Sequence, residues 1–356
     1  MRVALVGPIQ SGKSSLFAAV AQAGGSAVHL DRPDQPHLAV VKVPDPRVEW
    51  LAEHYKPKKV THAELELLDL PGMDLSDEAG RTRAKALWPA MRQSDMLVFV
   101  LRTFANEVVA PYRGRIDPLA DLQELQAEML FADLEQVLSR IEKLNAGIKK
   151  PGGKRDELLR EMDLMNRLKE ALENEKPIGG VVSSEAEAKL LRSFAFLSIK
   201  PQLVAINCDE QAAATGGPAE LSGVECIQLS AKIESELSLL PEAERSEFLA
   251  DLGLPASASD RMVRACYSKL NLISFLTAGE DECRAWTIPA GTDAVTAAGA
   301  IHSDIARGFI RAETVHYDDL HATGDMKAAR AAGKIRLEGK NYPVQDGDII
   351  NFRFNV

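Results

Sequence analysis

The sequence predicts a doubly wound α/β domain with a helical insert, followed by a small β-grasp domain. Short continuous apolar runs such as Val3–Val6 and Met96–Leu101 alternate with helical patterns, as in a parallel sheet covered on both faces. The alternation stops between about residues 122 and 197, where apolar residues recur at helical spacing. From about residue 282, short alternating strands surround one apolar helix.

The α/β part is predicted from four further strands and one helix. The helix, Leu16–Ala23, comes directly after a glycine loop. The strands are Leu38–Val43, Ala63–Leu68, Gln202–Ile206 and Glu225–Leu229.

The helical insert is predicted from two apolar stripes separated by a breaker. The first stripe runs from Leu122 to Leu144, about 35 Å as a helix. The second runs from Leu158 to Leu172, and Asn145–Lys154 between them holds three glycines or prolines in a row. Two antiparallel helices with a basic tip are the simplest arrangement. Two interpretations stay open: a pair packed on the core, or a projecting arm that binds a partner.

The C-terminal segment predicts strands, a helix and more strands. The helix is Val295–Ile305, and the strands are Arg284–Ile288, Phe309–His316, Ile335–Leu337 and Ile349–Phe354. The expected domains are residues 1–121 with 198–275 (α/β), 122–197 (insert) and 276–356 (β-grasp).

Composition limits the functional class. With 356 residues, 46% hydrophobic and 26% charged, the chain suffices for two or three globular domains. No apolar run approaches the ~18 residues that span a bilayer, and a strand expected from Val3 leaves no room for a leader, so we expect a cytoplasmic protein without a membrane partner. A net charge of −10 argues against broad nucleic-acid binding, and no sequence-specific DNA partner is expected. The four dispersed cysteines are typical of reduced thiols.

The strongest motif is an eight-residue loop between the first strand and the first helix. It fits the pattern G-x-x-x-x-G-K-[ST] and continues into Ser15: Gly7-Pro8-Ile9-Gln10-Ser11-Gly12-Lys13-Ser14. Glycines let successive backbone N–H groups point inward, and the helix N-terminus adds further donors for phosphate oxygens. Lys13 is expected to reach the β- and γ-phosphates, and the Ser14 hydroxyl to bind Mg²⁺.

Two later motifs extend this site. Asp69-Leu70-Pro71-Gly72 ends a strand, where Asp69 is expected to hold Mg²⁺ and the Gly72 N–H to sense the γ-phosphate. Asn207-Cys208-Asp209-Glu210 stands where such proteins read the base, and Ser230-Ala231-Lys232 is expected to support the base from the other side. Cys208 and Glu210 replace the Lys and Asp of the guanine-specific N-K-x-D, so strong guanine selectivity is not expected and the pocket is expected to accept adenine as well.

The chain resembles the YchF family of Obg-related P-loop NTPases over nearly its whole length. The resemblance is strongest from Leu229 to Val356, and Val43-Pro44-Asp45-Pro46-Arg47 also matches the family. The matching segments there are Ser230–Leu237, Thr277–Glu280, Arg284–Ile288, Arg307–Glu313 and Val344–Asp348. The resemblance implies an N-x-x-E base motif, a preference for ATP, a coiled-coil insert, a C-terminal TGS domain and association with ribosomes.

The switch regions depart from the family pattern. No threonine lies between Lys13 and Val43, and Ser26 is a poor substitute for the expected Mg²⁺ ligand. Met73 stands where Ras-like enzymes carry a water-orienting Gln, so slow turnover is expected. Three cations of the next segment could supply transition-state charge or form a solvated helix face: Arg81, Arg83 and Lys85. A structural or partner-contact role is expected for His302.

The leading hypothesis is a slow Mg²⁺-dependent ATPase of YchF type that couples ATP state to ribosome or translation-factor binding. Lys13 and Gly72 are its expected catalytic residues. The alternatives are a nucleotide-binding scaffold with negligible hydrolysis, a GTP-preferring hydrolase and, least favoured, a phosphotransferase. The sequence leaves the client and the oligomeric state open.

Overall fold

The chain forms two compact units in the computed structural model, which describes residues 1–26, 28, 30–150, 155–215, 217–251, 254 and 256–355. The first unit comprises Met1–Ala23, Ala27–Ala39 and Leu67–Ala258. The second comprises Gly24–Ser26, Val40–Glu66 and Ser259–Val356. In the described part of the chain, no helix is long and apolar enough to cross a membrane.

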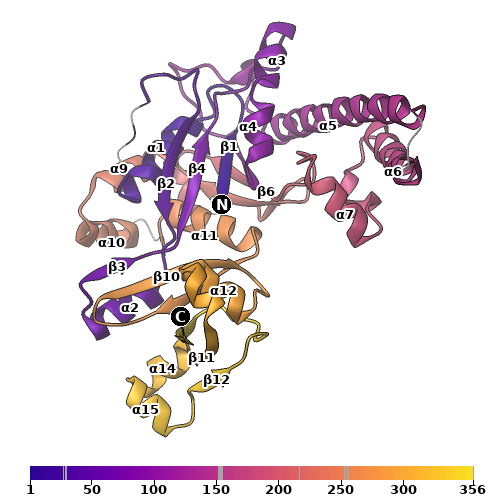
Figure 1. Cartoon of the computed structure of the whole chain (residues 1–356). Coiled ribbons are helices and arrows are strands. Elements are labelled where there is room, and N and C mark those ends of the chain that lie inside the picture. The colour runs from indigo at the N-terminus through magenta and orange to yellow at the C-terminus, as the bar shows by residue number, and fades with distance from the viewer. Residues whose placement is uncertain are drawn as a thin grey trace. The chain divides into compact units, whose positions relative to one another are not determined.

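The first unit is built on a seven-stranded sheet with the order β2-β4-β1-β5-β6-β8-β7 (Figure 1). Strands β1, β5, β6 and β8 are parallel neighbours, which confirms the doubly wound prediction. Strand β5 is buried at every residue because both faces of the sheet are covered. The strands are β1 (Arg2–Val6), β2 (His37–Lys42), β4 (Glu64–Asp69), β5 (Met96–Arg102), β6 (Gln202–Asn207), β7 (Glu220–Leu221) and β8 (Val224–Leu229).

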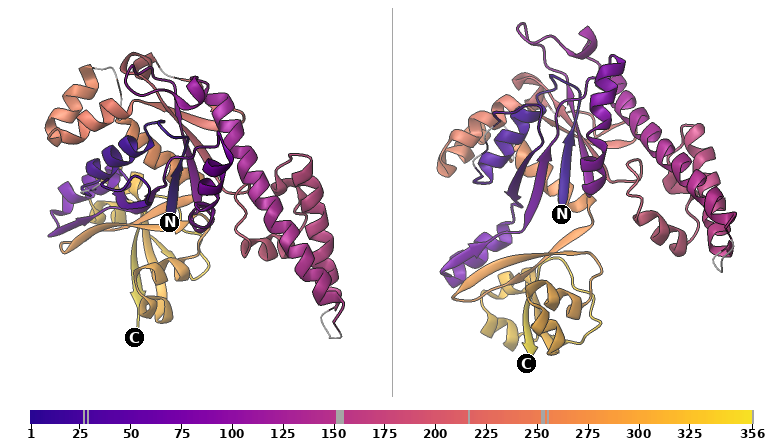
Figure 2. Two further views of the ribbon diagram at one scale, coloured as in Figure 1. Left: turned by 90° about the horizontal axis from the view of Figure 1, so that it is seen from above. Right: turned by 45° about the horizontal axis from the view of Figure 1, so that its top comes forward.

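Helices cover both faces of this sheet (Figures 1 and 2). On one face, α1 packs against α9. On the other face, Leu122, Leu125 and Met129 at the root of α5 share a core with Leu97 and Phe99 of β5. The helices are α1 (Lys13–Ala23), α3 (Glu78–Lys85), α4 (Trp88–Gln93), α8 (Glu210–Thr215), α9 (Ala231–Leu239) and α10 (Glu242–Asp251).

The insert is a long helical pair that extends away from the sheet (Figure 2). Helix α5 (Pro118–Ile148) has 31 residues, about 47 Å, and α6 (Arg155–Glu173) lies beside it. Apolar residues of both helices form a core of their own, closed by α7 (Glu185–Arg192). The predicted breaker falls partly at residues 151–154, outside the described residues.

The second unit is built on a six-stranded sheet with the order β12-β11-β13-β9-β10-β3. Its core includes Phe275, Phe352 and the alanines of α12, as a β-grasp domain requires. The strands are β3 (Lys59–Thr61), β9 (Leu272–Thr277), β10 (Glu282–Pro289), β11 (Phe309–His316), β12 (Arg336–Glu338) and β13 (Asp348–Phe354). The helices are α2 (Pro46–Tyr55), α11 (Ala258–Lys269), α12 (Ala294–Ile301), α13 (Ser303–Arg307), α14 (Tyr317–Thr323) and α15 (Met326–Ala331).

The expected domain limits differ from these units in two places. The limit at residue 276 would cut β9, whose six residues pair with β10. The residues between β2 and β4, expected in the α/β domain, form α2 and β3 of the second unit, where β3 pairs with β10.

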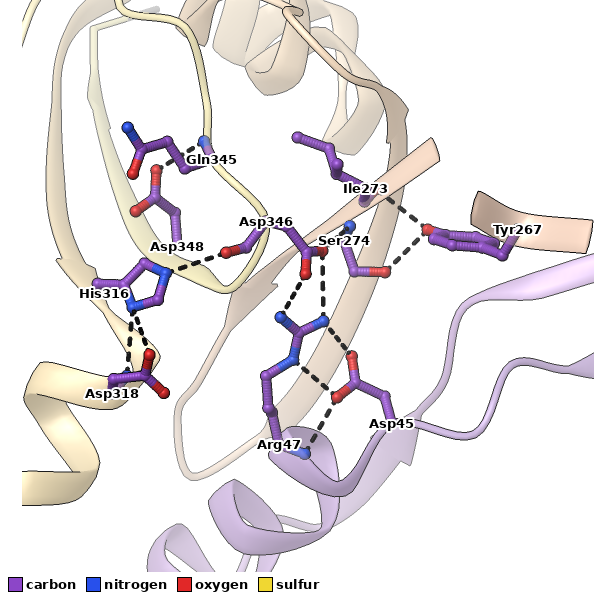
Figure 3. A network of polar contacts seen from close by, with 10 residues as sticks. All are labelled: Asp45, Arg47, Tyr267, Ile273, Ser274, His316, Asp318, Gln345, Asp346 and Asp348. Atoms are coloured by element: carbon purple, nitrogen blue, oxygen red, sulfur yellow. Dashed lines mark hydrogen bonds and ion pairs between the residues drawn. The ribbon is translucent and has the colours of Figure 1, made fainter. Parts of the chain in front are cut away.

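A polar network explains the Val43–Arg47 motif within the second unit (Figure 3). Asp45 caps α2 by accepting a hydrogen bond from the Arg47 backbone N–H. The Arg47 guanidinium donates to Asp45 (2.8 Å) and to Asp346 (2.7 Å), while Asp346 also accepts from the Ser274 N–H (2.8 Å). The two carboxylates raise the pKa of Arg47 despite its burial. The motif therefore attaches α2 to the turn before β13.

Candidate nucleotide-binding site

The turn of the glycine loop at the end of β1 requires glycine at two positions, Gly7 and Gly12. Gly12 has φ +81°, and a Cβ there would lie 2.1 Å from the Asn207 amide nitrogen. A Cβ on Gly7 would lie 2.4 Å from the Val100 carbonyl oxygen. Gln10 also has positive φ, at 63°. Glycine at residues 7 and 12 is thus required by close backbone and side-chain approach.

Lys13 opens α1 and lies buried at 4% exposure. Its ammonium forms an ion pair with the Asp69 carboxylate at the end of β4 and donates to the Leu70 carbonyl. Burial lowers the pKa of Lys13, and the Asp69 charge opposes that effect. The structure therefore brings together the predicted phosphate-binding cation and the predicted metal-binding carboxylate.

The expected metal ligands, Ser14 and Asp69, both carry hard oxygen donors. Ser14 is exposed at the start of α1, one residue after Lys13. Among the described residues, no group of three or more His, Cys, Asp or Glu could hold a metal ion. Mg²⁺ at nucleotide sites takes few protein ligands and completes its shell with phosphate oxygens and water, so a serine with one aspartate fits that ion.

The segment after Gly72 is paired with the glycine loop. The Met73 N–H donates to the Gly7 carbonyl (2.9 Å), and the Ile9 N–H donates to the Met73 carbonyl (3.0 Å). A Cβ on Gly72 would lie 3.0 Å from the Ile9 Cα, so glycine permits this approach. The Met73 side chain is buried in the core beneath the sheet. Its surroundings there are apolar side chains.

Two adjoining cavities share residues of the glycine loop. One of about 750 Å³ is bounded by the loop, Gly72 and Arg83. The other, of about 950 Å³, is bounded by the base motif and by Lys232. The shared residues are Gln10, Gly12 and Ser15. Both volumes suit a small-molecule ligand.

Asn207 joins three loops of this site. Its amide nitrogen donates to the Ser11 carbonyl (2.9 Å), and its amide oxygen accepts from the Ala231 N–H (3.0 Å). The side chain therefore holds the glycine loop against the Ser230–Lys232 loop instead of pointing freely at a base. Ser230 caps α9 by accepting from the Ile233 N–H.

The outer wall of the larger cavity carries the two substituted positions of the base motif. Glu210 pairs with Lys232 (2.5 Å) where both side chains are exposed, and this contact raises the pKa of Lys232. Cys208 is buried, its thiol donating to the Leu229 carbonyl (3.1 Å), and burial raises its pKa. A neutral thiol thus stands where the guanine motif has a long lysine stem.

Sequence reasoning missed Arg102, the last residue of β5, and Phe104, two residues after it. Arg102 is only 5% exposed and donates to the carbonyls of Val109 (2.9 Å) and Gln10 (3.4 Å). Its guanidinium lies 4.3 Å from the Phe104 ring centre, and Phe104 lines the larger cavity. Burial lowers the pKa of Arg102. The sequence did contain a signal for Arg102, because it is the one charged residue of an otherwise apolar strand.

The other residues singled out in the sequence make local contacts away from the glycine loop. Ser26 donates to the Val40 carbonyl (2.8 Å), whereas Asp34 of the following segment lines the smaller cavity. Lys85 pairs with Glu135 (2.7 Å), and Arg81 lies 3.7 Å from Glu128. His302 caps α13 by accepting from the Asp304 N–H (3.2 Å), a structural role.

A parallel sheet with a glycine loop between β1 and α1, a lysine at the helix start and an aspartate at the end of β4 defines a P-loop NTPase fold. Comparison with known proteins identifies the particular group. The family model YchF-GTPase_C, described as "Protein of unknown function (DUF933)", matches residues 272–355.

Full-length relatives agree with that match. "Ribosome-binding ATPase YchF" of Bacillus subtilis is 40% identical, covering 99% of this chain and 98% of the relative. The protein of the same name from Haemophilus influenzae is 36% identical over the same shares of both chains. The solved "Schizosaccharomyces pombe YchF GTPase" superposes with a TM-score of 0.84 at 29% identity, covering 99% of this chain and 97% of that one. The chain belongs to the YchF family.

Proposed function

We propose that this protein is a Mg²⁺-dependent ATPase that couples its nucleotide state to ribosome binding. The observation that carries the proposal is the pair of adjoining cavities that share the glycine loop. One cavity has the size and donors for phosphates, and the other is enclosed by loops suited to a base. Relatives over the full length are named ribosome-binding ATPases, which supports both the nucleotide and the partner.

The predicted residues of the phosphate cavity have separate roles in this proposal. Backbone N–H groups of the loop Gly7–Ser14, apart from the Ile9 N–H that is bonded to Met73, donate to the β-phosphate. Lys13 leaves Asp69 to neutralise the β- and γ-phosphates. The Gly72 N–H donates to the γ-phosphate. Ser14 and Asp69 would hold Mg²⁺, which neutralises phosphate charge when it is bound. Arg83 supplies further positive charge from the opposite wall.

Preference for adenine rests on the base motif. A guanine-specific aspartate accepts from two nitrogens of the base, but Glu210 is longer and is engaged with Lys232. Asn207 is engaged with two backbone partners and reads no base edge itself. Phe104 offers an aromatic face, which any base can stack on. The names of relatives differ on this point, since the fission yeast structure is called a GTPase.

Titration of the purified chain with ATP and GTP, followed by steady-state turnover, tests nucleotide choice. We expect tighter binding and faster release of phosphate with ATP. A strong preference for GTP would contradict the adenine assignment. Lys13→Ala should abolish phosphate-dependent binding, and unchanged binding would show that the loop is misassigned. The matched control is Lys143→Ala, an equal change on the helical pair.

Co-sedimentation with ribosomes in ATP, ADP or no nucleotide tests the partner. We expect the bound fraction to depend on the nucleotide, and equal fractions in all three conditions would contradict the coupling.

A nucleotide-binding scaffold without hydrolysis is the second candidate. It is favoured by the buried Met73 side chain and by the lack of a threonine between Lys13 and Val43. Single-turnover assays with and without ribosomes separate the two candidates, because the scaffold releases no phosphate in either condition.

A further inference from the structure

The segment after Phe104 carries contacts that binding of a nucleotide does not itself require. Tyr112 and Arg113 follow the loop that lines the larger cavity. Both reach Leu75 of the second switch (Met73–Gly80). The Leu75 N–H donates to the Tyr112 hydroxyl (3.1 Å), and Arg113 donates to the Leu75 carbonyl (2.9 Å). Both polar backbone groups of one switch residue are therefore fixed by neighbouring side chains.

The same two side chains also reach the root of the helical pair. The Tyr112 hydroxyl donates to the Glu124 carboxylate of α5 (3.1 Å). Arg113 forms an ion pair with the other oxygen of Glu124 and donates through Nε to the first (3.2 Å). Tyr112 is buried, and burial raises its pKa, so its hydroxyl stays protonated and keeps both contacts.

These contacts complete a continuous path from the glycine loop to α5. Met73 exchanges backbone hydrogen bonds with Gly7 and Ile9, and Leu75 lies two residues further along the switch. Two parallel contacts support the path: Arg81 near Glu128, and Lys85 with Glu135. Glu124, Glu128 and Glu135 are spaced by four and seven residues, which places them on one stripe of the helix.

We propose that Tyr112 and Arg113 are positioning residues that connect the second switch to the root of α5, so that nucleotide state alters the helical pair. The inference rests on the proposed function, because it requires a nucleotide at the glycine loop. A change at Gly72 and Met73 then displaces Leu75, and the buried bonds to Tyr112 carry that displacement to Glu124. The helical pair would thereby present a different surface in each nucleotide state.

Hydrogen–deuterium exchange of the full chain, with ADP and with a non-hydrolysable ATP analogue, tests this connection. In the wild type, exchanging one nucleotide for the other should change protection in residues 70–77 and in 118–130. Tyr112→Phe combined with Arg113→Ala removes both side-chain bridges between Leu75 and Glu124 and keeps the aromatic ring. We expect this double variant to retain the change in 70–77 and to reduce the change in 118–130 by at least about fivefold. Glu124→Ala, which removes the acceptor of both side chains on α5, should act alike if the double variant folds poorly.

Arg140→Ala is the matched control because Arg140, further along α5, pairs with Glu161 of α6 (2.6 Å) and takes no part in the path. It should leave both changes intact. The proposal is overturned if the double variant and the Glu124 variant keep the wild-type response in 118–130, or if wild-type exchange there ignores the nucleotide. If the wild type still binds the ATP analogue in either case, the proposed function stands although this inference fails. A wild type that binds neither nucleotide would refute the proposed function and the inference together.

Discussion

At the scale of single residues, the site depends on side chains that hold loops together. Asn207 is buried and uses its amide to bridge the glycine loop and the Ser230–Lys232 loop. Arg102 supports the glycine loop from the other side through the Gln10 carbonyl. Both side chains fix backbone groups of the loops that would contact the ligand. They can therefore affect ligand binding without touching the ligand.

Asn207→Ala should weaken ATP binding without unfolding the protein. The change leaves the Ala231 N–H and the Ser11 carbonyl without their partners. Loss of such bonds costs about 1–3 kcal/mol, so we expect affinity to fall by roughly 5- to 150-fold in calorimetric titration. Asn174→Ala is the control, since that amide only bonds the Glu170 carbonyl on the exposed end of α6. Equal affinities of both variants would contradict the bridging role.

Arg83→Ala should lower turnover more than affinity. Of the three cations of α3, Arg83 lines the phosphate cavity, whereas Lys85 pairs with Glu135 on α5. An arginine that stabilises transition-state charge contributes mainly to kcat, so we expect a fall of at least about tenfold. Lys85→Ala should keep basal kcat within about threefold, as for an exposed ion pair. A KM effect of Arg83→Ala without a kcat effect would contradict the role.

At the scale of elements, the position at which α5 begins determines which of its residues contact the segment that follows β5. Helix α5 begins at Pro118, capped by the Asp117 side chain, four residues before the apolar stripe that predicted it. Those four residues include Asp121, which pairs with Arg115 of the segment that follows β5 (3.2 Å). An Asp-Pro pair is a recognised helix start, so the sequence contained this signal.

Other elements were predictable only in part, for physical reasons. The buried strands β1, β5 and β6 were predicted because their apolar runs are continuous. The apolar stretch from residue 295 to 305 was expected as one helix but forms α12 and α13, since His302 leaves helical backbone and caps the second. The attachment of Arg47 to Asp346 joins residues 299 apart, a separation that no local pattern encodes.

Glu313 should make the β-grasp sheet sensitive to acid. It is buried on β11, where Arg353 and Arg330 lower its pKa below the ordinary 4.5. A depressed carboxylate pKa adds stability above the unfolded-state value, and this stability is lost as pH falls through the folded-state value. Glu313→Gln should therefore lower the free energy of unfolding at pH 7 by roughly 1 kcal/mol and flatten its fall below about pH 4.5.

Urea unfolding at a series of pH values measures this effect. Glu338→Gln on β12 is the control, because Glu338 lies at the longer distance of 3.7 Å from Arg336. That variant should keep the acid sensitivity of the wild type. An unchanged acid profile of Glu313→Gln would assign the sensitivity to other carboxylates.

At the scale of the whole molecule, the chain is organised so that the second unit interrupts the first. The residues between β2 and β4, which lie between the glycine loop and Asp69 in sequence, belong to the second unit and add β3 to the β-grasp sheet. Both candidate cavities, the second switch and the helical pair belong to the first unit alone. A ligand at the glycine loop therefore binds within the first unit. In the sequence, however, a segment of the second unit lies between the glycine loop and Asp69.

Calorimetric melting with and without ATP should consequently show which unit the nucleotide stabilises. At 100 times its Kd, a ligand that binds only the folded state adds about 2.7 kcal/mol to the free energy of unfolding. We expect this gain in the transition of the first unit, and Lys13→Ala should abolish it. The Glu313→Gln variant marks the transition of the second unit, because it lowers the stability of that unit at pH 7 and the difference from the wild type disappears in acid. If ATP shifts both transitions equally, the two units unfold as one cooperative system and the switch segments cannot respond independently of the β-grasp sheet.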